Sequence, residues 1–160
     1  MTLARSKPRA EGEPREPERA AYERDFYTWA LEQAALIRAG RIAEVDRENV
    51  AEEIESLARS EFDKFVSFLQ LILLHILKWD YQASRRTRSW RLSIALHRDH
   101  AKTVLDGNPG FKPRLDEALT MAYRRARLEA ARETKLPLAT FPEVCPYPFG
   151  DVFDRVFPSD

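Results

Sequence analysis

Three histidines, His75, His97 and His100, are the side chains best suited to metal or acid–base chemistry. Helical spacing turns His75 and His97 inward, and His100 follows His97 by about one turn. If their two helices run antiparallel, the imidazoles could meet in a helical bundle and hold a zinc-like divalent metal with one open position. Glu53 borders an apolar stripe and could act as a fourth ligand or a general base. This pattern predicts a metal-dependent hydrolase.

Core packing explains the same histidines equally well. Two buried imidazoles can form hydrogen bonds with neighbouring groups without binding a metal. The paired Glu-x-x-His motifs of di-iron bundles are absent from the sequence, and His97 with His100 is a lone His-x-x-His. The sequence therefore favours a protein without a cofactor, with the metal centre as an alternative.

A basic and aromatic segment, residues 78–91, could bind nucleic acid or a phosphorylated ligand. Guanidinium groups bind phosphates bidentately, and exposed aromatic rings stack on bases. The ligand-binding side chains would be Lys78, Trp79, Arg85, Arg86, Arg88 and Trp90. In the alternative interpretation both tryptophans belong to the core, because they fall on apolar stripes, and the arginines pair with the acidic residues 52–55.

Two further features invite chemical interpretation. Glu52, Glu53 and Glu55 together with Lys78 could hold a divalent metal for phosphodiester hydrolysis, although carboxylates on an exposed helix are usually only solvated charges. Cys145 has no histidine near it in sequence. We expect it to be a small buried apolar group.

Composition narrows the class of protein. The chain has 160 residues, of which 44% are apolar and 32% charged, with 26 basic and 26 acidic side chains. The formal net charge of zero removes global charge as an indication of a partner. The single cysteine cannot form an internal disulfide, no signal peptide follows Met1, and the most apolar run, 65–77, is too short to span a membrane. These features predict a cytoplasmic protein that does not enter a membrane.

Hydrophobic periodicity predicts helices almost throughout. Residues 1–20 carry three prolines and little to bury, so we expect a disordered tail before a single helical domain at 21–157. One helix is expected between Tyr22 and Gly40, and another starts at the capping residue Asp46. Near Ser60 either a third helix begins or the second one bends. Further helices are expected at 90–106 and 113–135.

The remaining residues, from Leu136, combine Pro137, Pro142, Pro146 and Pro148 with large apolar side chains. We expect an extended segment that packs on the helices. The fold prediction is therefore an all-α helical bundle of about five main helices, the third most buried, with a proline-rich C-terminal segment packed on it.

Four stretches resemble a known family. They are residues 22–40 (YERDFYTWALEQAALIRAG), 49–60 (NVAEEIESLARS), 74–90 (LHILKWDYQASRRTRSW) and 133–147 (ETKLPLATFPEVCPY). Together they resemble the bacterial family catalogued as domain of unknown function 29. The resemblance implies a helical fold and a compact bacterial protein, and it brings no substrate, cofactor or catalytic residue.

Without an assembled nucleophile, base and orienting group, the sequence favours a non-catalytic interaction or regulatory module. Such a module needs a protein partner or a second copy. A homodimer could use the small-residue face of the fifth predicted helix. That face consists of Leu115, Leu119, Ala122, Ala126 and Ala130. Binding of nucleic acid or a phosphate ligand is the second hypothesis, and the three-histidine hydrolase is the third.

Overall fold

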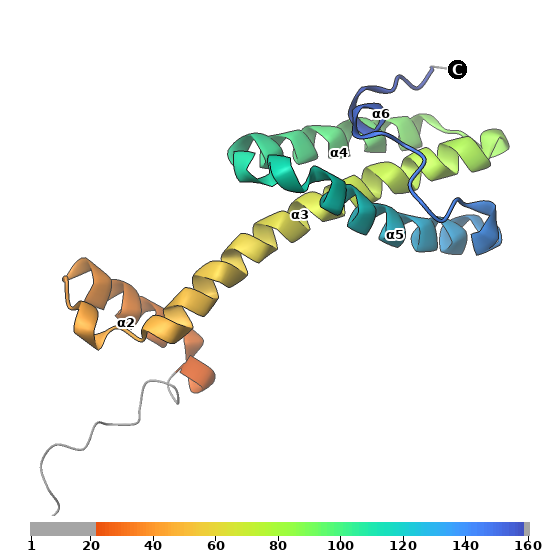
Figure 1. Cartoon of the computed structure of the whole chain (residues 1–160). Coiled ribbons are helices and arrows are strands. Elements are labelled where there is room, and N and C mark those ends of the chain that lie inside the picture. Colours follow the sequence, from red (N-terminus) through yellow and green to blue (C-terminus); the bar gives the residue numbers. More distant parts are fainter. Residues whose placement is uncertain (1–21, 159–160) are drawn as a thin grey trace, which may run out of the picture. The chain divides into compact units, whose positions relative to one another are not determined.

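The computed structural model describes residues 22–158, and the predicted tail 1–20 lies outside them. Every regular element in this part of the chain is a helix (Figure 1). The α-helices are α2 (Phe26–Arg38), α3 (Arg47–Tyr81), α4 (Arg88–Gly107), α5 (Leu115–Thr134) and α6 (Phe149–Asp154). Short 3₁₀ helices join them at Ile42–Glu44, Ala83–Arg85, Pro109–Arg114 and Leu138–Thr140. The prediction of an all-α helical bundle is confirmed.

The chain divides into two compact units between Ser56 and Leu57. In the N-terminal unit, the Asp25 carboxylate accepts a hydrogen bond from the Thr28 amide and caps α2. Gly40 takes a φ of +73° directly after α2, a conformation that glycine adopts without strain. The Asp46 carboxylate accepts from the Asn49 amide at the start of α3, which confirms its predicted role as a cap. The prediction of one domain at 21–157 stays a prediction.

One continuous helix spans Ser60, so the alternative in which a third helix begins there is wrong. The 35 residues of α3 contain neither proline nor glycine, so no residue interrupts its backbone hydrogen bonds. Its C-terminal half is the most buried part of the C-terminal unit, as expected for the predicted third helix. The fully buried residues there include Phe65, Leu69, Ile72, Ile76 and Leu77.

Two long helices and the C-terminal segment cover this part of α3 (Figure 1). Helix α4 contributes Ile94 and Ala101 to the core, and Thr87 caps it by accepting from the Trp90 amide. Helix α5 contributes four buried alanines, Ala118, Ala122, Ala126 and Ala130. A dimer through this small-residue face is therefore ruled out, because the chain's own core covers it.

The C-terminal segment packs on the helices as predicted, with Phe141, Val152 and Phe157 buried. The expectation that it is extended throughout is wrong for residues 138–140, which form a 3₁₀ helix, and for residues 149–154, which form α6. Pro148 precedes this helix, and no proline lies inside it, so the backbone amides of the short turn remain able to pair.

Candidate functional site

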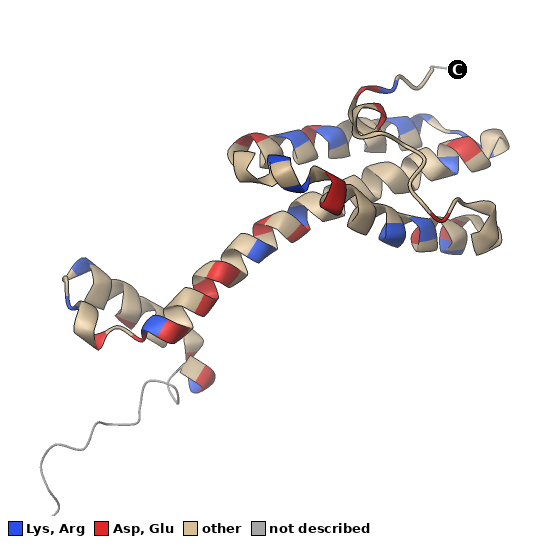
Figure 2. Ribbon diagram, viewed as in Figure 1, with Lys and Arg blue, Asp and Glu red and all other residues tan. Residues whose placement is uncertain are grey.

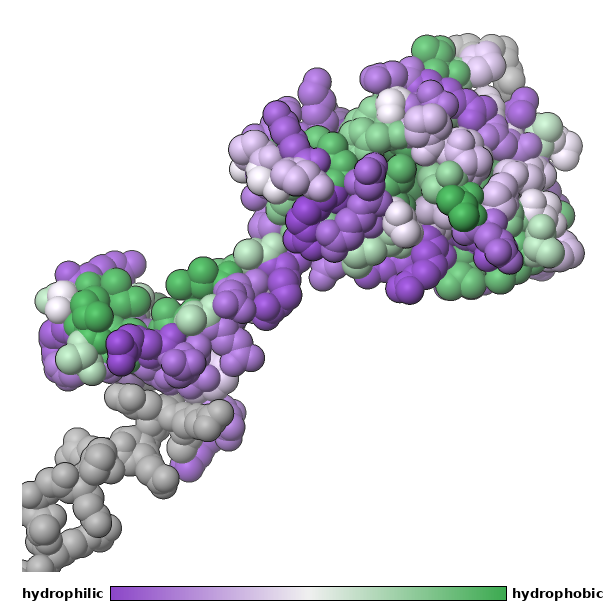
Figure 3. Space-filling view, viewed as in Figure 1, coloured by the Kyte–Doolittle hydropathy of each residue, from purple (hydrophilic) through white to green (hydrophobic). Residues whose placement is uncertain are grey.

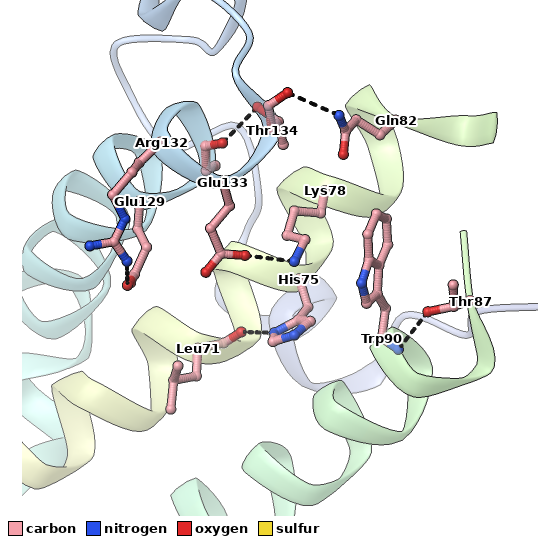
Figure 4. Close-up of polar contacts among 11 residues, drawn as sticks. Leu71, His75, Lys78, Gln82, Thr87, Trp90, Glu129, Arg132, Glu133 and Thr134 are labelled. Carbon is pink, nitrogen blue, oxygen red and sulfur yellow. Dashed lines mark hydrogen bonds and ion pairs between the residues drawn. The ribbon is translucent and has the colours of Figure 1, made fainter. Parts of the chain in front are cut away.

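The three histidines come together on the C-terminal unit. His75 lies on α3, and its Nδ1 is 2.8 Å from the Leu71 carbonyl oxygen one turn earlier (Figure 4). His97 and His100 lie on α4. The ring centre of His97 is 6.4 Å from that of His75 and 6.0 Å from that of His100. The predicted meeting of three imidazoles between two helices therefore exists, although the rings are only partly buried.

Packing with Phe68 dominates the surroundings of the α4 histidines. The Phe68 ring centre lies 5.0 Å from that of His100 and 6.2 Å from that of His97. The Nδ1 atoms of His97 and His100 are buried, and neither finds a hydrogen-bond partner in the described part of the chain. Burial lowers the pKa values of His75 and His97 below the ordinary value, so the neutral imidazoles are favoured.

At these ring distances the three imidazoles do not form a metal centre. Rings that share one tetrahedral zinc at normal Zn–N distances would have their centres roughly 5 Å apart. Within residues 22–158, no three His, Cys, Asp or Glu side chains are arranged to hold a metal ion. The metal-dependent hydrolase stays a prediction.

The proposed fourth ligand, Glu53, belongs to the N-terminal unit. Its carboxylate accepts a hydrogen bond from the Tyr22 hydroxyl. That bond raises the pKa of Tyr22 to about 12. Tyr22 also packs edge-on against Trp29. Glu53 therefore has a local structural partner within its own unit.

The two tryptophans of the basic and aromatic segment belong to the hydrophobic core. Lys78 lies between Glu133, whose carboxylate is 2.6 Å from the ammonium nitrogen, and the Trp90 ring, whose centre is 4.7 Å away (Figure 4). Trp79 is buried and packs edge-on against Phe157. The tryptophans therefore follow the alternative interpretation, and Lys78 already has a carboxylate partner.

Arg86 also has a partner within the folded chain, Trp79. Its Nε donates to the Trp79 carbonyl oxygen at 2.9 Å, and its guanidinium lies 5.2 Å from the Trp79 ring centre. Arg85 and Arg88 are exposed and make no side-chain hydrogen bond or ion pair within the described residues. A small hollow of about 110 Å³ adjoins Arg88 and is lined by Trp79, Thr87, Arg88, Arg91 and Pro158. Among the predicted basic residues, Arg85 and Arg88 are therefore those without a polar partner within residues 22–158, and the predicted ligand site stays a prediction.

A polar network that the sequence analysis missed joins α3 to the C-terminal segment. The Asp80 carboxylate accepts two hydrogen bonds from Arg155, at 2.6 and 2.8 Å, and one from the Tyr147 hydroxyl at 2.8 Å. Burial alone would raise the pKa of Asp80, but the hydrogen bonds from Arg155 and Tyr147 lower it below its ordinary value. Because the partners lie 67 and 75 residues from Asp80, no local pattern could have predicted them.

Cys145 behaves as a structural thiol. Its Sγ lies 3.5 Å from the Tyr147 carbonyl oxygen, and the residue is half-buried. Burial raises its pKa, which disfavours the reactive thiolate. Its environment agrees with the expected packing role.

Exposed apolar side chains are concentrated on the N-terminal unit. Only Trp29 and Gln33 are buried among its described residues, whereas Tyr27 is 74% exposed and Leu31 54% exposed. The other large apolar side chains exposed there are Phe26, Ile37, Ile42 and Ile54. Figure 3 shows this hydrophobic surface in green. Helical spacing alone could not identify this surface, because it does not show whether an apolar face is covered.

The two units also differ in charge. Residues 22–56 carry nine Asp and Glu against four Arg, whereas residues 57–158 carry seventeen Lys and Arg against twelve Asp and Glu. Acidic residues recur along the N-terminal part of α3 (Figure 2). The zero net charge of the chain therefore conceals an acidic unit and a basic unit.

Comparisons with other proteins identify the family. None of the helices within 22–158 has the length and hydropathy needed to cross a bilayer. Searches of curated proteins and of solved structures gave no match. The family profile described as "Domain of unknown function DUF29" matches residues 21–158, a description that names no activity. Because this match covers most of the chain and confirms the resemblance found in the sequence, the protein belongs to the DUF29 family.

Proposed function

We propose that this protein is a non-catalytic interaction module whose N-terminal unit binds a partner through its exposed apolar surface. The observation that carries the proposal is the exposure of six large apolar side chains on a unit with only two buried described residues. Large apolar patches on a protein surface commonly mark sites of interaction. These six side chains keep much of their area exposed in the folded unit, and a partner would give that exposed area a role.

Coverage of a few of these side chains would supply a useful binding energy. Complete burial of one large apolar side chain is worth about 1.5–3 kcal/mol. Tyr27, Leu31 and Ile54 retain more than half of their exposure in the folded unit. Tyr27 and Leu31 are spaced one turn apart on α2, so a single partner element can contact both.

Charge indicates the chemistry of the partner. Because the unit is acidic, it favours a positively charged ligand and disfavours an acidic one. A basic amphipathic helix offers both an apolar face for α2 and lysines or arginines for the surrounding carboxylates. The partner that fits this surface best is a protein segment of that kind.

The test uses a fluorescein-labelled helical peptide of about 18 residues with leucines on one face and lysines on the other. Fluorescence anisotropy with the full chain should show binding. Leu31→Glu should weaken it at least about tenfold, since the substitution puts a charge in the apolar contact.

Leu128→Glu provides the matched control, because Leu128 is an exposed leucine on α5 in the other unit. It should leave the affinity unchanged. Circular dichroism should show equal helix content in both variants. Equal binding of the peptide to both variants, or stronger binding of a peptide with glutamates in place of the lysines, would reject the proposed surface.

A second candidate function, polyanion binding by the C-terminal unit, is favoured by its excess of basic side chains and by the exposed Arg85 and Arg88. Single-stranded DNA should bind at low salt and dissociate steeply as salt rises. Replacement of both arginines by alanine should weaken binding, whereas Arg124→Ala on α5 should not. Absence of binding at low salt would eliminate this candidate.

A further inference from the structure

A second exposed apolar surface lies on α4, in the C-terminal unit. Leu92 and Leu96 are each 52% exposed and stand one helical turn apart. Helix α4 buries Ile94 and Ala101, so the core contact of the helix uses other positions. A shallow, open hollow follows the exposed leucines. It is lined by Arg88, Ser89, Leu92, Ser93, Ala95 and Leu96.

Opposite charges flank the two leucines on the same face. Spacings of four, four and three residues place Arg88, Leu92, Leu96 and Asp99 on one stripe of α4. All four side chains are exposed. Arg88 makes no ion pair within the described residues, and the same holds for Asp99. The stripe thus carries a positive end, an apolar centre and a negative end over about three turns.

This order is self-complementary when two helices run antiparallel. A twofold axis near the middle of the stripe would place Leu92 against the partner's Leu96 and Arg88 beside the partner's Asp99, with both pairs formed twice. Ser89 and Ala95 are small and would let the two helices approach closely. A parallel arrangement would instead set Arg88 against the partner's Arg88, which is repulsive.

We infer that this face of α4 is a self-association surface and that its occupant is α4 of a second copy of the chain. The stripe is short, so the contact falls below the roughly 1,200 Å² that stable complexes bury. The dimer should therefore be weak and dependent on protein concentration. It uses neither α2 nor the small-residue face of α5.

Sedimentation equilibrium of the full chain tests the inference through charge reversal. Arg88→Glu alone should raise the dimer Kd about tenfold, because two acidic side chains would face each other at both ends. Asp99→Arg alone should do the same. The double variant, Arg88→Glu with Asp99→Arg, should return the Kd to within about threefold of the wild type, since the pairs form again with exchanged signs.

Leu92→Glu should abolish the dimer, whereas the matched Leu128→Glu on α5 and Leu31→Glu on α2 should leave the Kd unchanged. Circular dichroism and thermal unfolding establish that the variants fold. A protein that stays monomeric at millimolar concentration would overturn the inference. A dimer that survives Leu92→Glu, or single charge reversals that the double variant does not rescue, would do so as well.

Discussion

Burial gives His75 and His97 a different protonation behaviour from that of free histidine. Their folded-state pKa values lie below the ordinary value, chiefly because the partly buried cluster disfavours the imidazolium. Lys78 lowers the pKa of His75 further, while Glu133 and Glu129 oppose that effect. His97 faces the other two imidazoles, which also disfavour its charged form.

At the residue scale, this predicts a loss of stability in mild acid. The unfolded chain binds protons at the ordinary histidine pKa of about 6.5, whereas the folded chain resists them, so stability should fall as pH drops from 7.5 to 5.5. His97→Leu should make this decline smaller, with His75 retaining part of it. Urea unfolding at both pH values measures the difference. An unchanged decline in the variant would contradict a neutral, partly buried His97.

The same substitution has a second expected effect at pH 7.5. His97 buries an Nδ1 atom without a hydrogen-bond partner among the described residues, and such an atom costs about 1–3 kcal/mol. Leucine removes that atom and can still pack against Phe68. The variant should therefore be at least as stable as the wild type at this pH.

At the scale of the elements, one side chain of α4, Arg98, forms hydrogen bonds with the C-terminal end of α6. The Arg98 guanidinium donates to the carbonyl oxygens of Asp151, Val152 and Arg155 at 3.2, 2.7 and 2.9 Å. These carbonyls belong to the end of α6 and the residue after it, where helical acceptors run short of intrahelical donors, although Asp151 also accepts from the Arg155 amide. A planar fork of donors suits this position better than a single ammonium group does.

Arg98→Lys should therefore loosen α6 and lower the free energy of unfolding by about 1–3 kcal/mol. Hydrogen–deuterium exchange should become faster in residues 149–155, whereas the buried part of α3 should keep its protection. Arg124→Lys is the matched control, because Arg124 is exposed on α5. Equal exchange in the two variants would show that Arg98 does not hold α6.

Across the whole molecule, the two units have very different cores. The C-terminal unit buries a continuous cluster from Phe62 to Phe157, while Trp29 and Gln33 are the buried described residues of the N-terminal unit. Since stability in a protein follows the local density of buried contacts, the units should open at different free energies.

Trp29→Ala should unfold α2 with little effect on the C-terminal unit. Truncation of a buried tryptophan costs about 3–5 kcal/mol, which is large for so small a unit. Hydrogen–deuterium exchange should accelerate in residues 26–38 and 47–56 and remain slow in 65–77. Equal acceleration in all three segments would mean that the units unfold together.

Much of the secondary structure could be predicted because its causes are local. Apolar spacing and the capping residue Asp46 predicted helix starts that the structure confirms, and the absence of proline and glycine explains the unbroken α3. The proximity of His75 and His97 could also be predicted, since two antiparallel helices bring residues at the same level together.

The other side-chain contacts depend on residues that are far apart in the sequence. Lys78 pairs with Glu133, and Asp80 pairs with Arg155, because folding brings together segments that are 55 and 75 residues apart. The alanines of α5 and the leucines of α4 both form regular apolar stripes in the sequence, yet the first stripe is buried and Leu92 and Leu96 stay exposed. Sequence alone determined which residues share a helix face, because helical geometry is local. Only the tertiary structure decided which faces the chain covers with itself, because that depends on how distant helices pack.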